Sequence, residues 1–133
     1  GQPDRRVGEM PVAFVQMRAG EAFDEDAIKS FVRERIQERA ANPVAIHQLA
    51  EMPLTQVGKI FKPALRMEAA RLHLQQELSA LAKDRAEVAV TVAAHPVHGT
   101  LATITLRGGN EDLAESVKAA VGGYPLHTEI VRV

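Results

Sequence analysis

Apolar and polar residues alternate in a way that predicts strand, helix, strand over the first third of the chain. The apolar run from Val12 to Met17 predicts a buried strand. Asp24 is placed to cap a following helix, and Pro43 is expected to end it. The apolar face of this helix is expected to comprise Ile28, Phe31, Val32 and Ile36. A second strand is predicted from Val44 to Leu49, and a crossover of this size allows the two strands to pair in parallel.

A long helix is predicted from Pro63 to about Lys83. Its apolar stripe changes face between Leu72 and Leu74, where a break is expected. The spacing of hydrophobic residues along the chain also changes after this point. We therefore expect one domain over residues 1–72 and an extension over residues 73–133 that packs on it.

The extension has the pattern of strand, strand, helix, strand. Alternation over residues 88–92 and 102–106 predicts a β-hairpin, with a turn between them. Asn110 is placed to cap a helix through Val121, and a last strand is expected over residues 126–133. The whole chain is thus predicted to be α+β, with small mixed sheets packed with helices.

Composition bounds the function only loosely. The chain has 133 residues, of which 46% are hydrophobic and 25% charged, as is ordinary for a globular protein. A formal net charge of -1 gives no reason to expect a nucleic acid or an anionic membrane surface as partner. The absence of cysteine excludes disulfides and thiolate chemistry. No apolar run is long enough to span a bilayer, so we expect no transmembrane segment and a soluble, cytoplasmic protein.

The segment PLTQVGKIFKPALR, residues 53–66, carries the strongest candidate chemistry. Lys59 directly follows Gly58, whose backbone freedom suits a turn, and Pro63 can start a helix. An ammonium group on such a loop acts as a mobile point charge toward a developing oxyanion. Lys62 lacks the preceding glycine and ranks second. The plainer alternative is a solvated lysine in a turn between two elements.

Three segments in order resemble the C-terminal domain of AMP-forming acyl-CoA synthetases, a family of adenylate-forming enzymes. They are GEMPVAFVQM (residues 8–17), FVRERIQERAANP (residues 31–43) and PLTQVGKIFKPALR (residues 53–66). The likeness extends from about Pro3 to Arg71. It implies that residues 1–72 are the mobile lid domain of such an enzyme.

The resemblance also implies a two-step reaction. A fatty acid attacks ATP, which binds with Mg²⁺, to give an acyl-adenylate and pyrophosphate, and coenzyme A then displaces AMP. Lys59 occupies the position of the adenylation lysine, and Thr55 and Gly58 belong to its substrate- and nucleotide-binding loop. The lid swings between two orientations against a large N-terminal domain, which holds the phosphate loop and is not found in this sequence. The isolated piece is therefore expected to be inactive.

Two features modify what the resemblance implies. Leu54 and Asn42 stand where many relatives carry lysines, so the adenylation lysine has less cationic support here. The spacing from Pro53 to Lys59 resembles an acetylation motif of bacterial acyl-CoA synthetases. Acetylation by a protein acetyltransferase would remove the charge of Lys59 and silence adenylation.

Other candidates are weaker. His95 and His98 are three residues apart but fall on a turn without an acidic or cysteine companion, so we predict no metal site. The histidines His47, His73 and His127 are scattered along the chain. A stand-alone α+β module for binding or dimerisation, without catalysis, is the alternative function. The extension itself is read either as such a module, with its last strand at a sheet edge, or as a structural cap on the long helix.

Overall fold

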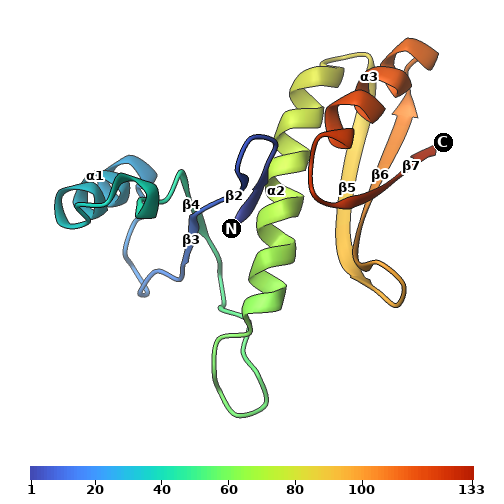
Figure 1. The fold of residues 1–133 in the computed structure, drawn as a ribbon. Coiled ribbons are helices and arrows are strands. Elements are labelled where there is room, and N and C mark those ends of the chain that lie inside the picture. The colour runs from blue at the N-terminus through green and yellow to red at the C-terminus, as the bar shows by residue number, and fades with distance from the viewer.

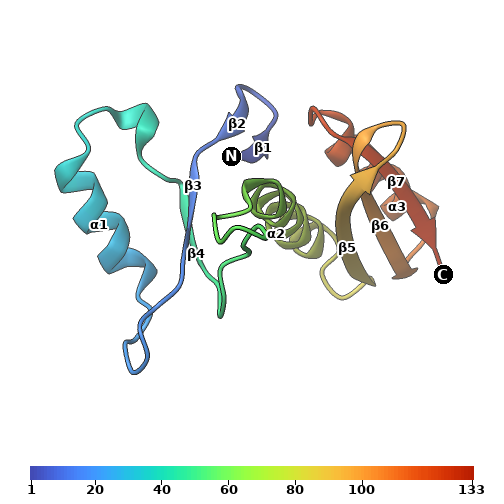
Figure 2. The same cartoon turned by 90° about the horizontal axis from the view of Figure 1, so that it is seen from below.

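The computed structural model describes residues 1–133 as an α+β fold with three small sheets and three α-helices. The predicted fold class is confirmed. Figures 1 and 2 show the elements in a row: helix α1, strands β3 and β4, the long helix α2, and then the sheet β5–β6–β7 with helix α3. None of the helices combines the length and apolarity that crossing a bilayer requires.

The chain begins with a short hairpin that the apolar pattern did not predict. Strands β1 (Gln2–Asp4) and β2 (Gly8–Met10) pair antiparallel, and β1 lies against α2. The Asp4 carboxylate closes the turn by accepting the backbone N–H groups of Arg6 and Val7, at 2.8 and 3.0 Å. Strands of three residues are too short to show a period of two, which is why the pattern missed them.

Strands β3 (Val12–Val15) and β4 (Ala45–Gln48) form a parallel pair, as predicted. Helix α1 (Glu25–Arg35) makes the crossover between them. Asp24 caps this helix, because its carboxylate accepts the Ala27 N–H at 3.0 Å.

The prediction that Pro43 ends α1 is wrong. The helix ends at Arg35, and a single 3-10 turn (Arg39–Ala41) follows. The Asn42 side-chain amide donates to the carbonyls of Ile36 and Glu38, at 3.3 Å each. Because these bonds satisfy backbone groups locally, they replace the helical bonds that a longer α1 would need.

The predicted apolar face of α1 is not buried either. No residue of the helix is buried, and Phe31 is 55% exposed. The Arg35 guanidinium lies 3.5 Å above the centre of the Phe31 ring. The helix contacts β4 but has no second layer to cover it.

Helix α2 (Lys62–Ala82) is continuous through Leu72, where a break was expected. Pro63 is its second residue, which agrees with the predicted start within one position. Lys83, at φ 52°, ends the helix. The expected boundary after residue 72 therefore falls inside a helix that both parts of the chain share.

The rest of the chain forms the predicted hairpin, helix and strand. Strands β5 (Ala86–His95) and β6 (Gly99–Gly108) pair antiparallel, and β7 (His127–Arg132) pairs parallel with β6. Between them lies α3 (Glu111–Gly122), capped by Asn110. The sheet order β5–β6–β7 leaves the last strand at an edge.

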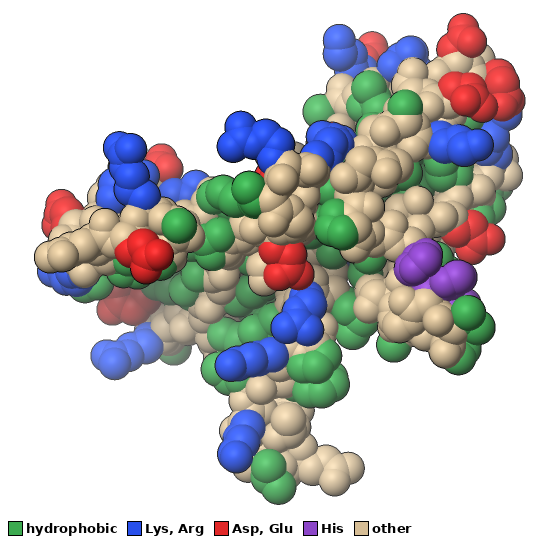
Figure 3. Space-filling model, viewed as in Figure 1, with side chains coloured by type: hydrophobic (Ala, Val, Ile, Leu, Met, Phe, Trp, Pro, Cys, Tyr) green, Lys and Arg blue, Asp and Glu red, His purple; other side chains and the backbone are tan.

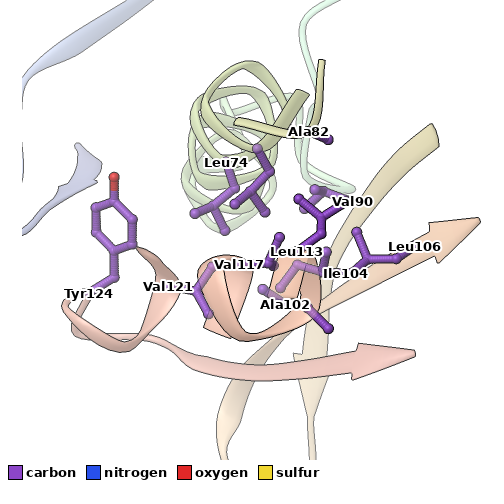
Figure 4. Packing of buried hydrophobic residues seen from close by; sticks show 12 residues of the cluster. Leu74, Ala82, Val90, Ala102, Ile104, Leu106, Leu113, Val117, Val121 and Tyr124 are labelled. Carbon is purple, nitrogen blue, oxygen red and sulfur yellow. The ribbon is translucent and has the colours of Figure 1, made fainter. Parts of the chain in front are cut away.

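The hydrophobic core lies almost entirely between α2, α3 and this sheet (Figure 4). Helix α2 contributes the buried Leu74, Leu78 and Ala82. The sheet contributes Val90, Ala102, Ile104 and Leu106, and α3 contributes Leu113, Ala114, Val117 and Val121. These α3 residues form the face of the helix that points into the core.

A polar cluster of Arg5, Glu77 and Tyr124 fastens the N-terminal hairpin to the rest of the fold. Arg5 pairs with the Glu77 carboxylate, donates twice to the Ala120 carbonyl at 2.9 and 3.1 Å, and lies 4.4 Å above the Tyr124 ring. The Tyr124 hydroxyl donates to Glu77 and lies 2.9 Å from Nε2 of His73. Burial, and then the hydrogen bond to Glu77, raise the pKa of Tyr124 well above its usual range.

Candidate functional site

The segment that carries Lys59 is a loop between β4 and α2. It projects away from the other elements at the foot of α2 (Figure 1), and it forms the lowest lobe of the surface in Figure 3. At its base, the Met52 N–H donates to the side-chain carbonyl of Gln16, at 2.8 Å. The loop is therefore tied to the segment that follows β3 while its tip stands free.

Backbone hydrogen bonds give the projecting loop a defined shape. Leu54 and Ile60 form an isolated antiparallel bridge, and the Phe61 N–H donates to the Pro53 carbonyl at 2.8 Å. Inside this bridge, the Thr55 N–H donates to the Lys59 carbonyl at 2.7 Å. The loop is thus a small hairpin, and it presents Lys59 from a fixed backbone.

Thr55 and Gly58 both serve the shape of this hairpin. The Thr55 hydroxyl accepts the Lys59 N–H at 3.1 Å, and the Thr55 carbonyl accepts the Gly58 N–H at 3.0 Å. Gly58 has φ +81°, a conformation that side chains with a Cβ rarely adopt. A Cβ there would meet nothing within 4 Å, so the backbone angle rather than space requires the glycine. The positive φ angle of the turn is thus the reason that a glycine precedes Lys59 in the sequence.

The Lys59 side chain is exposed and takes part in none of the seven ion pairs of the chain. Its ammonium group therefore remains available to a partner outside this chain segment. Lys62, the second candidate, is the first residue of α2 and lines a hollow of about 240 Å³ beside Val12 and Phe14. Lys59 thus lies on the projecting loop, whereas Lys62 lies at the start of α2, next to the rest of the fold.

Large apolar side chains are exposed on the same loop as Lys59, a feature that the sequence reasoning missed. The exposed ones on this loop are Leu54 (59%), Val57 (80%), Ile60 (50%) and Phe61 (43%). An apolar collar around one cation suits docking into a cleft that excludes water, where a charge acts most strongly. The signal was present in the sequence, because apolar residues recur in a segment whose proline and glycine content predicts a loop.

The histidines that look scattered along the sequence are brought together in part. The ring of His98 stacks on His95 at 4.8 Å and on His127 at 4.3 Å between centres. No group of three or more His, Asp or Glu side chains is arranged to hold a metal ion. Another histidine, His47, lies on β4, 5.3 Å from the Phe14 ring. Burial lowers the pKa of His47, and its Nε2 atom is buried without a hydrogen-bond partner.

Comparison with known proteins shows which family the N-terminal part of the chain resembles. Residues 1–59 match the family described as the AMP-binding enzyme C-terminal domain. The matched segment ends at Lys59 and contains the hairpin β1–β2, the parallel strands and most of the projecting loop.

Several curated proteins are similar to the chain. It is 38% identical over 81 residues to marinolic acid–CoA ligase of Pseudoalteromonas sp.. It is 36% identical over 81 residues to acetyl-coenzyme A synthetase of Deinococcus radiodurans. Each of these matches covers 61% of this chain and 12% of the relative. It is 35% identical over 66 residues to a methyl-dioxo-octahydroindenyl-propanoyl:CoA ligase of Mycobacterium tuberculosis, covering 50% of this chain and 13% of that relative. No solved structure matches. The chain thus spans about an eighth of the length of these relatives. Residues 1–59 are therefore similar to the AMP-binding enzyme C-terminal domain, and the three relatives are named as CoA ligases or as an acetyl-coenzyme A synthetase.

Proposed function

We propose that this chain is the C-terminal piece of an AMP-forming acyl-CoA ligase and that Lys59 is its adenylation lysine. The observation that carries the proposal is the exposed ammonium group of Lys59 on a projecting, hydrogen-bonded loop, without an acidic partner of its own. The large domain of the same enzyme would supply the nucleotide cleft. Residues 1–72 would act as the lid, and residues 73–133 as an extension packed on the shared helix α2.

The chemistry assigned to Lys59 is electrostatic. In the adenylation step a carboxylate oxygen attacks the α-phosphate of ATP and pyrophosphate leaves, so negatively charged oxygens approach one another. A preorganised cation beside them stabilises this arrangement, and its effect is largest in a dry cleft. The apolar collar of Leu54, Val57, Ile60 and Phe61 would exclude water as the loop docks. Thr55 and Gly58 would hold the loop backbone next to the nucleotide.

The lid would then swing to a second orientation in which coenzyme A displaces AMP. ATP and coenzyme A are the substrates implied by the three relatives, which are all named as CoA ligases or an acetyl-CoA synthetase. Mg²⁺ would enter with ATP and be held mainly by the large domain. Such an enzyme would act in the cytoplasm, where its nucleotide and coenzyme A are available.

The acid that is activated is a carboxylic acid, and we propose a fatty acid. The relatives are named for acids as different as acetic acid and marinolic acid. The C-terminal family is therefore compatible with acids of very different size. A panel of acids tested on the intact enzyme would identify the substrate.

The experiment is pyrophosphate exchange by the intact parent enzyme, which reports the adenylation step alone. Lys59→Ala should lower the exchange rate by about 100- to 1000-fold, the usual cost of losing one preorganised electrostatic donor. Lys62→Ala is the matched control and should keep most of the parent rate. If Lys59→Ala exchanged as fast as the parent enzyme, the proposal would be wrong.

We also propose that acetylation of Lys59 switches the enzyme off. The exposed side chain leaves the amine open to a protein acetyltransferase, and acetylation would remove its charge. Incubation with an acetyltransferase and acetyl-CoA, followed by peptide mapping, should place the acetyl group on Lys59 and show a parallel loss of adenylation. Modification at other lysines alone would contradict this.

A further inference from the structure

A cavity of about 410 Å³ lies where the N-terminal hairpin, the first turns of α2 and the C-terminal part of the chain meet. Its walls come from strands β1 and β2, from α2, from the β5–β6 turn and from the start of β7. The volume lies within the range of small-molecule sites. No residue of the projecting loop that carries Lys59 lines this cavity, so its function is a separate question.

The cavity contains one cationic side chain that has no partner within the chain. Arg66 lines it and takes part in none of the chain's ion pairs. The lining contains one carboxylate, that of Glu9. Its Oε2 atom lies beside Gly1, another residue of the lining, 3.1 Å from the position that a Cβ on Gly1 would take. A guanidinium group without an internal partner binds carboxylate or phosphate oxygens through two parallel hydrogen bonds.

Two histidines give the same cavity a flat wall. The rings of His98 and His127 stack at 4.3 Å, with 28° between their planes, and both residues line the cavity. They come from the β5–β6 turn and from β7, and His95 continues the stack behind His98. The Nδ1 atom of His95 accepts two backbone N–H groups of the turn, which fixes the turn in this position. Figure 3 shows the histidines as one patch on the surface. Stacked imidazole rings offer a face to a flat aromatic ring and N–H groups to an anion.

The cavity depends on the contact between the two ends of the chain. Arg5, in the hairpin, reaches the Ala120 carbonyl and Glu77 and holds β1 and β2 beside the segment that follows Tyr124. The next residues, Pro125 to His127, line the cavity. The Arg5, Glu77 and Tyr124 cluster thus keeps opposite walls of the cavity in place.

We propose that this cavity binds a small aromatic anion, with its carboxylate or phosphate on Arg66 and its ring on the outer face of His127, which ends the histidine stack. Met67 and Leu126 supply an apolar lining for the body of the ligand. The site would give the residue 73–133 extension a ligand-binding role, because two of the walls, the β5–β6 turn and the start of β7, come from the extension. The proposal stands whether or not Lys59 is the adenylation lysine.

Calorimetric titration of the 133-residue chain tests this, with two flat anions as probes. AMP represents a phosphate source and indole-3-acetate a carboxylate source, and one of them should bind at about 1 mM or tighter. Adenosine and inorganic phosphate separate the two halves of AMP, and indole and acetate separate the two halves of indole-3-acetate. Each half should bind more weakly than the flat anion that it comes from. Arg66→Gln should weaken binding by about 10- to 100-fold. Arg33→Gln, the same change on the exposed helix α1, is the matched control and should leave affinity unchanged.

Two further variants test the histidine wall of the cavity and the expectation that the cavity prefers a negatively charged ligand. His127→Ala should weaken binding of the aromatic probe by about 10-fold while leaving the weak binding of inorganic phosphate in place. Glu9→Gln should strengthen binding a few-fold, because it removes the one negative charge of the lining. Circular dichroism of each variant checks that the fold is intact.

The proposal would be overturned by any of three results. The first is that neither flat anion binds at millimolar concentration. The second is that Arg66→Gln binds as tightly as the parent chain, or no worse than Arg33→Gln. The third is that inorganic phosphate binds as tightly as AMP, which would leave the histidine wall without a role.

Discussion

The part of the chain before α2 and the part after residue 73 are built in opposite ways. Of the fifteen buried hydrophobic residues, Ile46 is the only one that precedes α2, whereas twelve form one cluster between α2, α3 and the three-stranded sheet. Most of the exposed large hydrophobic residues, in contrast, precede α2. They are Val7, Phe31, Val44, Leu54, Val57, Ile60 and Phe61.

This contrast separates stability from the proposed activity. The segment that matches the lid-domain family buries little against itself and leaves apolar surface free, as expected of a body that docks against another domain. The extension, expected from its size to need packing on the lid, instead contains the larger core. Helix α2 joins the two, and its C-terminal half belongs to that core.

Truncation in each region should test the contrast most strongly. Leu78→Ala opens a cavity in the cluster and should lower the free energy of unfolding by about 2–5 kcal/mol. Ile46→Ala should cost less than half as much, because Ile46 lies outside the twelve-residue cluster and few buried side chains surround it. Urea denaturation followed by circular dichroism measures both. Equal losses would show that the two regions are packed alike.

The polar cluster that joins the regions gives the next largest effect. Glu77→Gln removes the ion pair with Arg5 and should cost on the order of 1–2 kcal/mol, because the pair is partly buried. Glu87→Gln is the matched control: Glu87 lies 3.8 Å from Arg107, but both side chains are largely exposed. Hydrogen exchange should show faster opening of β1 and β2 in the first variant alone. Unchanged exchange there would mean that the hairpin does not depend on the cluster.

Two helix caps of the same kind should contribute differently to the free energy of unfolding. Asn110→Ala should lower the free energy of unfolding by about 1 kcal/mol, because α3 is part of the core. Asp24→Ala removes the same kind of bond from α1, which has no buried residue, so the helix should fray while global stability changes little. Denaturation midpoints of the two variants decide this, and a larger loss for Asp24→Ala would reverse the comparison.

The smallest expected effect is a pH dependence from His47. Burial, only partly offset by the Glu25 and Glu68 carboxylates, lowers the pKa of His47 below its ordinary value of 6.5. Since the unfolded chain then binds the proton more readily, stability should fall as pH drops from above 6.5 toward the lowered value. Denaturation midpoints at pH 7 and pH 5 should differ less in His47→Gln than in the parent chain. The same drop in both would assign the effect to other groups.

The sequence predicted the elements whose signals are local. The cap at Asp24, the cap at Asn110 and the parallel pair β3–β4 follow from short patterns, and all three are confirmed. The early end of α1 could not be predicted, because it depends on a side chain, Asn42, that returns to carbonyls up to six residues earlier.

For the candidate site, the glycine–lysine pair indicated the loop, and Gly58 has the backbone angle that this requires. The apolar collar and the cavity at Arg66 depend on which side chains stay exposed and which segments meet in space. Periodicity along one chain does not report either of these. The contact between Arg5 and Ala120 could not be predicted for the same reason, because the two residues are 115 positions apart in the sequence.

The central claim is that Lys59 serves adenylation from a loop that docks elsewhere, and the two half-reactions of the intact enzyme test it most directly. In Lys59→Ala, formation of acyl-adenylate from acid and ATP should fall by about 100- to 1000-fold. Formation of the thioester from presynthesised acyl-adenylate and coenzyme A should keep most of the parent rate, because under this proposal the lysine would have left the cleft by then. An equal fall in both half-reactions, or undiminished adenylation, would contradict the claim.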